Sequence, residues 1–329
     1  MTGGRSTSAG GTTPGPCSRT ASSSSGSCGT ATPAERRSAQ RGTAALLAAS
    51  FCIGAGTIAI REAYGLGAQP SSLLVVRFGI AGLLFALMLP WLVGQARGAI
   101  SWKGVGLAAL GGVILFTGAR GEFEGLQWLP AAVLILLIFV SPIWVVLIER
   151  IVYGRRASVR TLGAIALVIA GITIMVGPLG GGLNLVGLLC GLAASITLAI
   201  FFVLIDRSQD EMPVSVALPV AIVAAGLAGT LADVSAWSTE LGRDGALLYA
   251  LLVGLAVWSW ALFAIVGFRE TDAVTVAVVG ATEPVFVAVL ALIFLGEGLG
   301  ANELIGGAVV MAGVLAVSTA EPLKAAMAP

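Results

Sequence analysis

Residues 142–154 read PIWVVLIERIVYG and residues 284–296 read PVFVAVLALIFLG, so the proline and the final glycine recur 142 positions later. The spacing stays in register through the apolar stretch after each copy, where the matched residues are Leu162 with Leu304 and Gly171 with Gly313. Over residues 131–176 and 273–318, roughly ten of about 46 aligned positions are identical, which indicates an internal repeat. In a membrane protein, such duplication is typical of a transporter built from two halves around a central site.

The composition excludes an ordinary water-soluble fold. Hydrophobic residues make up 57% of the chain, charged residues only 11%, and the mean hydropathy is +0.99. A soluble domain averages about 25% charged residues. The formal net charge of +1 gives no reason to expect a nucleic acid as partner. The chain has no histidine, which excludes histidine proton relays, most zinc sites and Ser-His-Asp triads.

Neither a metal nor a cofactor is expected. The four cysteines form no CxxC pair, and we interpret them as small apolar residues: Cys17, Cys28, Cys52 and Cys190. The sequence contains no GxxxxGK[ST] segment, so ATP hydrolysis within this chain is not expected.

Two terminal tails are expected to lie outside the helices. Residues 1–42 consist mainly of Ser, Gly, Thr, Pro and Ala, with five Arg against the single acidic Glu35, which predicts a disordered cytoplasmic tail. An organellar transit peptide and a start codon placed too early are the alternatives. Residues 321–329 are expected to form a short cytoplasmic C-terminal tail.

Apolar runs near 20 residues long predict ten transmembrane helices. Their expected ranges are 43–60, 71–94, 104–123, 128–148, 159–177, 184–205, 214–233, 245–267, 273–295 and 302–320. We therefore expect an all-α integral membrane protein with two five-helix repeats, at residues 43–177 and 184–320. Because five is an odd number of spans, the second repeat is expected to be inverted relative to the first.

The basic residues predict the orientation. With a cytoplasmic N-terminus, the inner segments hold 14 Lys and Arg and the outer segments hold three, which are Arg61, Arg120 and Arg243. The N-terminal tail supplies five of the 14, and the remaining nine against three still follow the positive-inside rule. Both termini are therefore predicted to be cytoplasmic, in a multi-pass protein of the plasma (bacterial inner) membrane.

Glu283 is the leading candidate for a functional residue, because it lies near the middle of the ninth predicted span. A charge at the bilayer centre costs about 2.5–3.5 kcal/mol on insertion scales, so such a residue should face the protein interior. One hypothesis makes Glu283 a proton carrier. The alternative makes it a protonated or hydrogen-bonded strut that steadies the adjacent proline kink.

The two repeated prolines, Pro142 and Pro284, are predicted to shape a central pathway. Each removes a helix hydrogen bond near midspan and frees a carbonyl. Neighbouring side chains could supply polar contacts and aromatic walls, and these are Ser141, Trp144, Thr282, Phe286, Trp258 and Trp260. The alternative is that the kinks only shape the bundle, while the hydroxyls join helices and the indoles belong to an interfacial belt.

Charged residues near the outer side form a second candidate region. Arg77 lies about two turns inside the outer end of the second span, where it could snorkel outward, pair with a carboxylate or bind an anionic substrate. Arg120, Glu122 and Glu124 cluster at the outer end of the third span, and Arg120 and Glu124 could pair along one helix face. We interpret the cluster as an outer vestibule, with a solvated helix end as the alternative.

The chain resembles the EamA-type family of the drug/metabolite transporter superfamily from about residue 43 to 320. The resemblance rests on Arg77-Phe78, on Ser141-Pro142-Ile143-Trp144, and on Glu283-Pro284-Val285-Phe286. It continues in Phe294-Leu295-Gly296-Glu297, Leu304-Ile305-Gly306 and Ala312-Gly313-Val314. Two features depart from the family pattern: Gly154-Arg155, where a glutamate is common, and the charged Arg120, Glu122 and Glu124 cluster.

The resemblance implies secondary transport of small metabolites, often export of amino acids or related solutes, through a central cavity by alternating access. The expected partners are a small-molecule solute, the lipid bilayer and a proton as coupling ion, and a homodimer is a candidate assembly. A membrane-embedded enzyme for lipid or isoprenoid substrates is the first alternative, but no DxxxD-type pair lies in an apolar span. A non-transporting membrane subunit is the second. We expect a transporter and not an enzyme.

Overall fold

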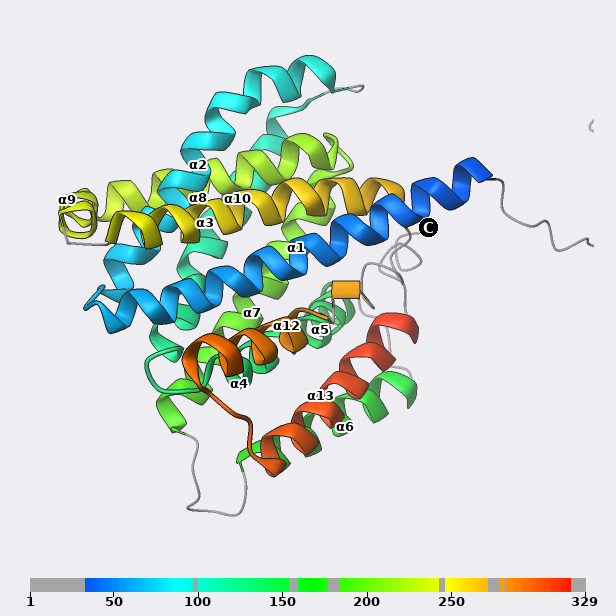
Figure 1. The fold of residues 1–329 in the computed structure, drawn as a ribbon. Helices are drawn as coiled ribbons and strands as arrows, with labels where there is room; N and C mark the ends of the chain where they lie inside the picture. Colours follow the sequence, from blue (N-terminus) through cyan, green and yellow to red (C-terminus); the bar gives the residue numbers. More distant parts are fainter. Residues whose placement is uncertain are drawn as a thin grey trace, which may run out of the picture.

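The computed structural model describes residues 33–96, 100–153, 159–176, 184–242, 246–271, 279–280 and 282–320. Every regular element in these residues is a helix (Figure 1). The helices are α1 Pro33–Gly65, α2 Pro70–Gln95, α3 Trp102–Gly125, α4 Ala131–Ile138, α5 Ser141–Tyr153, α6 Val159–Val176, α7 Leu185–Ser208, α8 Val214–Ala232, α9 Ser235–Leu241, α10 Ala246–Glu270, α12 Glu283–Leu290, a π-helical turn η1 Ala291–Leu295, and α13 Ala301–Ala320.

Seven apolar helices in the described residues are long enough to cross a bilayer. They are α1, α2, α3, the run from α4 into α5, α7, α8 and α10. Three shorter apolar helices occupy the other predicted ranges, in α6, in α12 with η1, and in α13. The prediction of an all-α membrane protein is confirmed at this level. Residues 272–278, which include the first part of the ninth predicted span, lie outside the described residues.

The boundary of the N-terminal tail was predicted wrongly. Helix α1 begins at Pro33, so residues 33–42 are helical where the sequence indicated disorder. This stretch, PAERRSAQRG, is rich in Ala, Glu, Arg and Gln, which are strong helix formers and extend the adjoining span. Gly42 also packs against the end of α10, because a Cβ there would lie 2.5 Å from Thr271 Cγ2. Residues 1–32 lie outside the described part of the chain.

The fourth predicted span is two helices. Helix α4 ends at Ile138 and α5 begins at Ser141. Pro142 explains the break, because its ring nitrogen cannot donate to the carbonyl four residues earlier. Its repeat counterpart Pro284 is the second residue of α12, a position where a missing N–H costs nothing. Both prolines therefore lie at the start of a helix.

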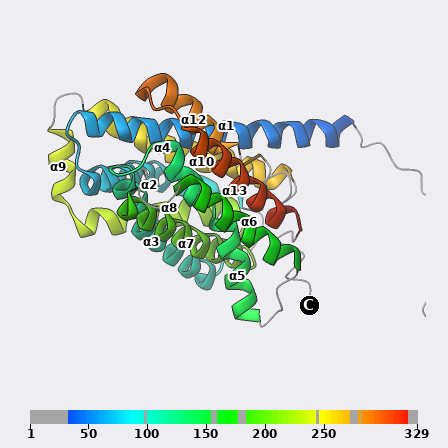
Figure 2. The same ribbon diagram turned by 90° about the horizontal axis from the view of Figure 1, so that it is seen from below.

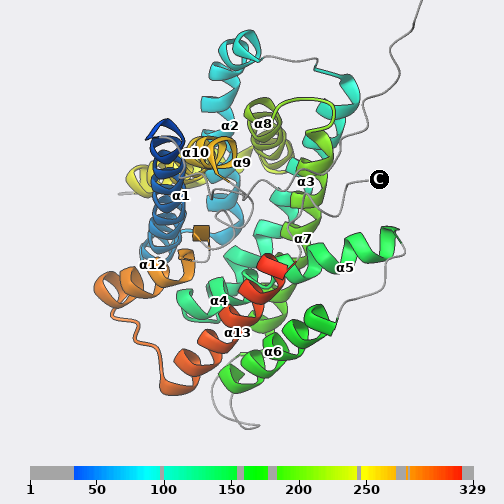
Figure 3. The ribbon, with the colours of Figure 1, turned by 90° about the vertical axis from the view of Figure 1, so that its right-hand side faces the viewer.

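The helices pack in pairs that the repeat relates to one another. With an offset of 142 residues, α1 corresponds to α7 and α3 corresponds to α10. Helix α1 packs along α10, and α7 packs along α3, so the correspondence exchanges these two pairs. The pairs α2 with α8 and α6 with α13 each map onto themselves. Figures 1, 2 and 3 place the α6–α13 pair on one side of the molecule and α2, α8 and α9 on the other.

Connections gather at two opposite ends of the bundle. At one end, Glu211 before α8 accepts hydrogen bonds from the Ser101 hydroxyl (2.7 Å) and Lys103 Nζ (2.9 Å) at the start of α3. At the other end, the backbone N–H of Gln69 before α2 donates to Glu240 of α9 (3.2 Å). Helix α9 was not predicted. Asp233 caps its N-terminus by accepting from Ser235 Oγ at 2.6 Å and from Ala236 N at 3.2 Å.

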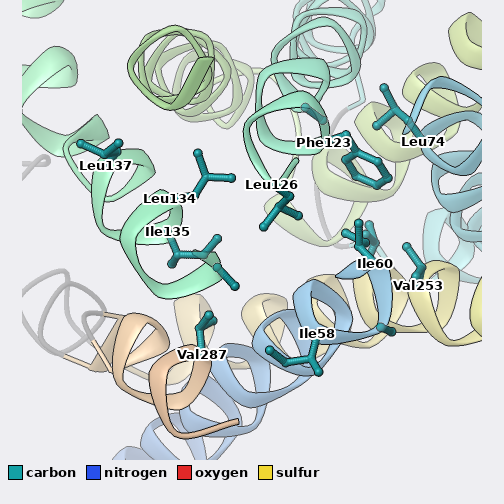
Figure 4. Close-up of a cluster of buried hydrophobic side chains, with 14 of the residues drawn as sticks. Ile58, Ile60, Leu74, Phe123, Leu126, Leu134, Ile135, Leu137, Val253 and Val287 are labelled. Carbon is teal, nitrogen blue, oxygen red and sulfur yellow. The ribbon is translucent and has the colours of Figure 1, made fainter. Parts of the chain in front are cut away.

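A large apolar cluster holds the bundle together. Side chains of α1, α2, α3, α4, α10 and α12 meet in it (Figure 4). Its fully buried members include Ile60, Leu74, Phe123, Leu134 and Val253. Because these residues come from both halves of the chain, the halves share one core.

Candidate functional site

A buried ion pair joins α2 and α3. Arg77 Nη1 lies 3.1 Å from Glu122 Oε1, and the two side chains are only 5% and 15% exposed. Of the three alternatives open from the sequence, the guanidinium therefore takes the pairing with a carboxylate and does not snorkel outward. Removing one member of such a pair costs about 3–5 kcal/mol, because the other charge stays buried.

Two aromatic rings flank the Arg77 guanidinium. Its carbon lies 5.3 Å from the ring centroid of Phe123 and 5.7 Å from that of Phe78. Both distances allow cation–π attraction, which strengthens where water is excluded. Arg77 Nε makes no hydrogen bond to any described residue, so the guanidinium has donor capacity to spare.

Glu283 completes a charged cluster inside the bundle. It is the first residue of α12, it is half-buried, and its carboxyl lies within electrostatic range of Glu122 and Arg77. Three helices thus bring two carboxyl groups and one guanidinium into one apolar interior. A bound proton or a positively charged group of a solute would balance the excess negative charge.

A pocket of about 280 Å³ lies where α2 begins and α3 ends. Its lining residues are Pro70, Ser71, Leu74, Arg120, Phe123 and Glu124. Of the three predicted vestibule residues, Arg120 and Glu124 border this pocket. Glu122 instead turns inward to Arg77. Glu124 accepts a hydrogen bond from Gln127 Nε2 at 2.6 Å, and within the described chain no ion pair joins it to Arg120.

A second ion pair ties four elements together at the same end. Arg61 of α1 pairs with Glu297, which follows η1, and also donates to the carbonyl of Leu126 after α3. Glu297 Oε2 accepts from the backbone N–H of Ala131 at the start of α4 (3.0 Å). Gly296 makes this possible, because its positive φ of 65° turns the chain sharply before Glu297. We call Arg61 and Glu297, with these two backbone groups, the outer clasp.

The remaining predicted pathway residues make packing and hydrogen-bond contacts between helices, and their part in a pathway stays a prediction. Trp144 Nε1 donates to Ser195 Oγ at 2.9 Å, which joins α5 to α7. Phe286 meets Phe51 edge-on, with ring centroids 5.8 Å apart. Ser141 and Pro284 are buried, Pro142 is half-buried, and Thr282 donates to Val279 O at 2.6 Å.

The two tryptophans of α10 differ. Trp258 lies 6.4 Å from the ring of Phe85, and its buried Nε1 makes no hydrogen bond to any described residue. An unpartnered buried donor suits a polar solute or water. Trp260 is half-buried and packs against the apolar core. Trp258 therefore remains the better candidate for the pathway.

The structure adds four residues that sequence reasoning did not select for the site. They are Arg61, Tyr64, Phe123 and Glu297. Two signals were available: Arg61 is one of only three basic residues assigned to the outer side, and Glu297 belongs to the quoted family motif. Within the described chain, no group of three or more His, Cys, Asp or Glu side chains could hold a metal ion.

Known proteins resemble this chain over most of its length. The model of the EamA-like transporter family matches residues 40–177 and again residues 185–319. The uncharacterized transporter YcbK of Bacillus subtilis is 25% identical over 285 residues, covering 82% of this chain and 90% of the relative. An uncharacterized transporter of Archaeoglobus fulgidus is 25% identical over 205 residues, covering 62% of this chain and 73% of the relative.

A solved crystal structure is similar to this chain in fold. It superposes with a TM-score of 0.54 at 18% sequence identity and covers 88% of this chain and 99% of its own. At that identity the likeness concerns the arrangement of helices alone.

Proposed function

The chain belongs to the EamA-like transporter family, and from this premise we propose that it moves small metabolites across the plasma membrane by alternating access. We further propose that it is an exporter of amino acids or related solutes and that a proton is the coupling ion. The observation that carries the proposal is the cluster of Arg77, Glu122 and Glu283. Ionisable side chains inside an apolar membrane bundle mark solute and ion pathways.

The packing supports ten spans in two inverted repeats. The helix pairs α1–α10 and α7–α3 exchange under the 142-residue offset, as a two-fold relation between halves requires. The shorter helices α6, α12 with η1, and α13 would then be the fifth, ninth and tenth spans. In such transporters the site lies between the repeats, where discontinuous helices meet. The break before Ser141 is one such discontinuity, and Glu283 is the first residue of α12.

The positions of the loops support cytoplasmic termini. The excess of Lys and Arg assigns the end that holds Ser101 and Glu211 to the cytoplasm. The pocket and the outer clasp would then face the opposite side. A solute would pass between the pocket and the charged cluster, and the bundle would rearrange to expose the cluster to one side at a time.

Glu283 is the proposed proton carrier. Its neighbours Glu122 and Arg77 oppose each other electrostatically, so a change in either one alters the balance at Glu283. A solute that binds this cluster would favour one protonation state of Glu283 and so couple the transport of the solute to the transport of a proton.

Transport driven by a proton gradient tests the proposal. Purified protein in liposomes is given a labelled pool of amino acids and small metabolites, with and without an imposed pH gradient. We expect the wild type to accumulate at least one solute faster with the gradient, and Glu283→Gln to lose that acceleration. Glu303→Gln, at the first turn of α13, is the matched control and should behave as wild type. Normal gradient-driven transport by Glu283→Gln would refute the role of Glu283.

A further inference from the structure

One aromatic side chain borders both the outer pocket and the buried charges. Phe123 lines the 280 Å³ pocket, and its ring centroid lies 5.3 Å from the guanidinium carbon of Arg77. The side chain is only 1% exposed. Figure 4 shows it beside Leu74, another residue that lines the pocket. A solute in the pocket therefore meets the face of this ring before it can meet the Arg77–Glu122 pair.

Helix α1 holds Phe123 in this position through its backbone. The Tyr64 hydroxyl donates to the carbonyl of Phe123 at 2.9 Å. One turn earlier on α1, Arg61 donates to the carbonyl of Leu126. The last carbonyls of a helix lack partners within the helix, so side-chain donors fix its end strongly. Through Glu297 and the N–H of Ala131, the outer clasp extends this attachment to α4 and to the end of η1.

Among the residues that the structure describes, the repeat places no matching side chains at the opposite end of the bundle. With the 142-residue offset, the counterparts of Arg61 and Tyr64 are Val203 and Asp206, neither of which can donate as a guanidinium or a phenol does. The counterpart of Phe123 is Ile265, which is not aromatic. The attachment is therefore a feature of one end and not a general consequence of the repeat.

We propose that Phe123 is the gate residue at the outer end of the transport pathway, and that Tyr64 and the outer clasp hold it closed. The inference rests on the proposed function. In the closed state the ring covers the Arg77–Glu122 pair. Opening requires α1 to release the carbonyls of Phe123 and Leu126, so that the end of α3 can move away and the pocket can join the charged interior. Phe123 is a positioning residue here, since it controls access without binding the solute.

The test measures access to a cysteine placed beyond the ring. Ala81 is fully buried on α2, one turn further from the pocket than Arg77, whereas Ser71 is exposed and lines the pocket itself. In a background without the four native cysteines, we would place Ala81→Cys or Ser71→Cys and follow their reaction with a small membrane-impermeant thiol reagent. Sealed vesicles of known orientation confine the reagent to the outer side.

We expect Ser71→Cys to react readily and Ala81→Cys to be protected while Phe123 is intact. Phe123→Ala should bring the reaction of Ala81→Cys to the rate of Ser71→Cys. Tyr64→Phe keeps the ring and removes one hydrogen bond, which should raise the open fraction about fivefold. Phe123→Leu retains bulk and is the matched control, with protection largely kept.

An unchanged rate at Ala81→Cys in both Phe123→Ala and Tyr64→Phe would overturn the gate. A folded state is verified for each variant by the unchanged reactivity of Ser71→Cys and by the melting temperature. Because accessibility is read without any solute, its failure is separate from a failure of the transport proposal. Solute accumulation is measured on the same vesicles: accumulation with unchanged accessibility would refute the gate and leave the transporter intact.

Discussion

Replacing Glu122 should leave the buried guanidinium of Arg77 without its carboxylate partner. Its partner Arg77 has a side chain only 5% exposed, and Glu122 is 15% exposed, so solvent screens the pair little. Breaking such a pair costs about 3–5 kcal/mol. We therefore expect Glu122→Gln to destabilise the protein by about 3–5 kcal/mol, because the charge of Arg77 stays buried without its partner.

The double variant Arg77→Met with Glu122→Leu distinguishes this reasoning from simple loss of packing. It replaces both charges by apolar groups, which is often neutral or stabilising compared with a buried pair. We therefore expect the double variant to be more stable than Glu122→Gln alone. The assay is equilibrium unfolding in detergent micelles, with the free energy of unfolding compared across Arg77→Met, Glu122→Leu and the double variant.

Additivity would refute the account. If the double variant loses as much stability as the two single variants together, Arg77 and Glu122 do not interact energetically in the folded protein.

Three further predictions follow from single contacts. Gly112→Ala should destabilise by about 1–3 kcal/mol, because its Cβ would lie 1.9 Å from Ala221 O of α8, whereas Gly106→Ala on the same helix has open space and should not. Glu297→Gln should lower the free energy of unfolding by about 1–3 kcal/mol and raise the unfolding rate, because Arg61 and the N–H of Ala131 lose a charged acceptor. An unchanged melting temperature would contradict this prediction. The hydrogen bond from Ser101, followed by that from Lys103, lowers the pKa of Glu211 in the folded protein. The wild type should therefore be more stable than Glu211→Gln above about pH 4.3, the pKa of a glutamate in an unfolded chain. This difference in stability should be lost as the pH falls through the folded-state pKa. Melting curves between pH 7 and pH 3 test the last prediction, and a constant gap between the two proteins would rule it out.

The positions of the helices follow closely from the sequence because bilayer thickness fixes a simple rule. An apolar run near 20 residues must satisfy its backbone internally, so it forms a helix. The break at Pro142 was likewise predictable from the missing N–H. The helical start at Pro33 was missed, because polar helix formers next to a span carry no hydropathy signal. Helix α9 was missed because it is only seven residues long.

The sequence identified residues of the candidate site better than it predicted how they are arranged in space. Burial of a charge in an apolar run selects Arg77 and Glu283 without any structure. The partner of Arg77 is 45 residues away on another helix, and Arg61 and Glu297 are 236 residues apart. Such proximity comes from helix packing and not from local spacing. The spacing of Arg120 and Glu124 suggested a pair along α3, but both instead line the pocket.

Solute counterflow into liposomes with the wild type and Arg77→Met tests the central claim most directly. Liposomes preloaded with unlabelled solute are diluted into a trace of the labelled form, so accumulation needs a working site but no gradient. We expect the wild type to accumulate the labelled solute and Arg77→Met to fail to do so. A measurable, cooperative unfolding transition verifies that Arg77→Met is folded. Accumulation by folded Arg77→Met at the wild-type rate would contradict the assignment of the buried cluster as the transport site.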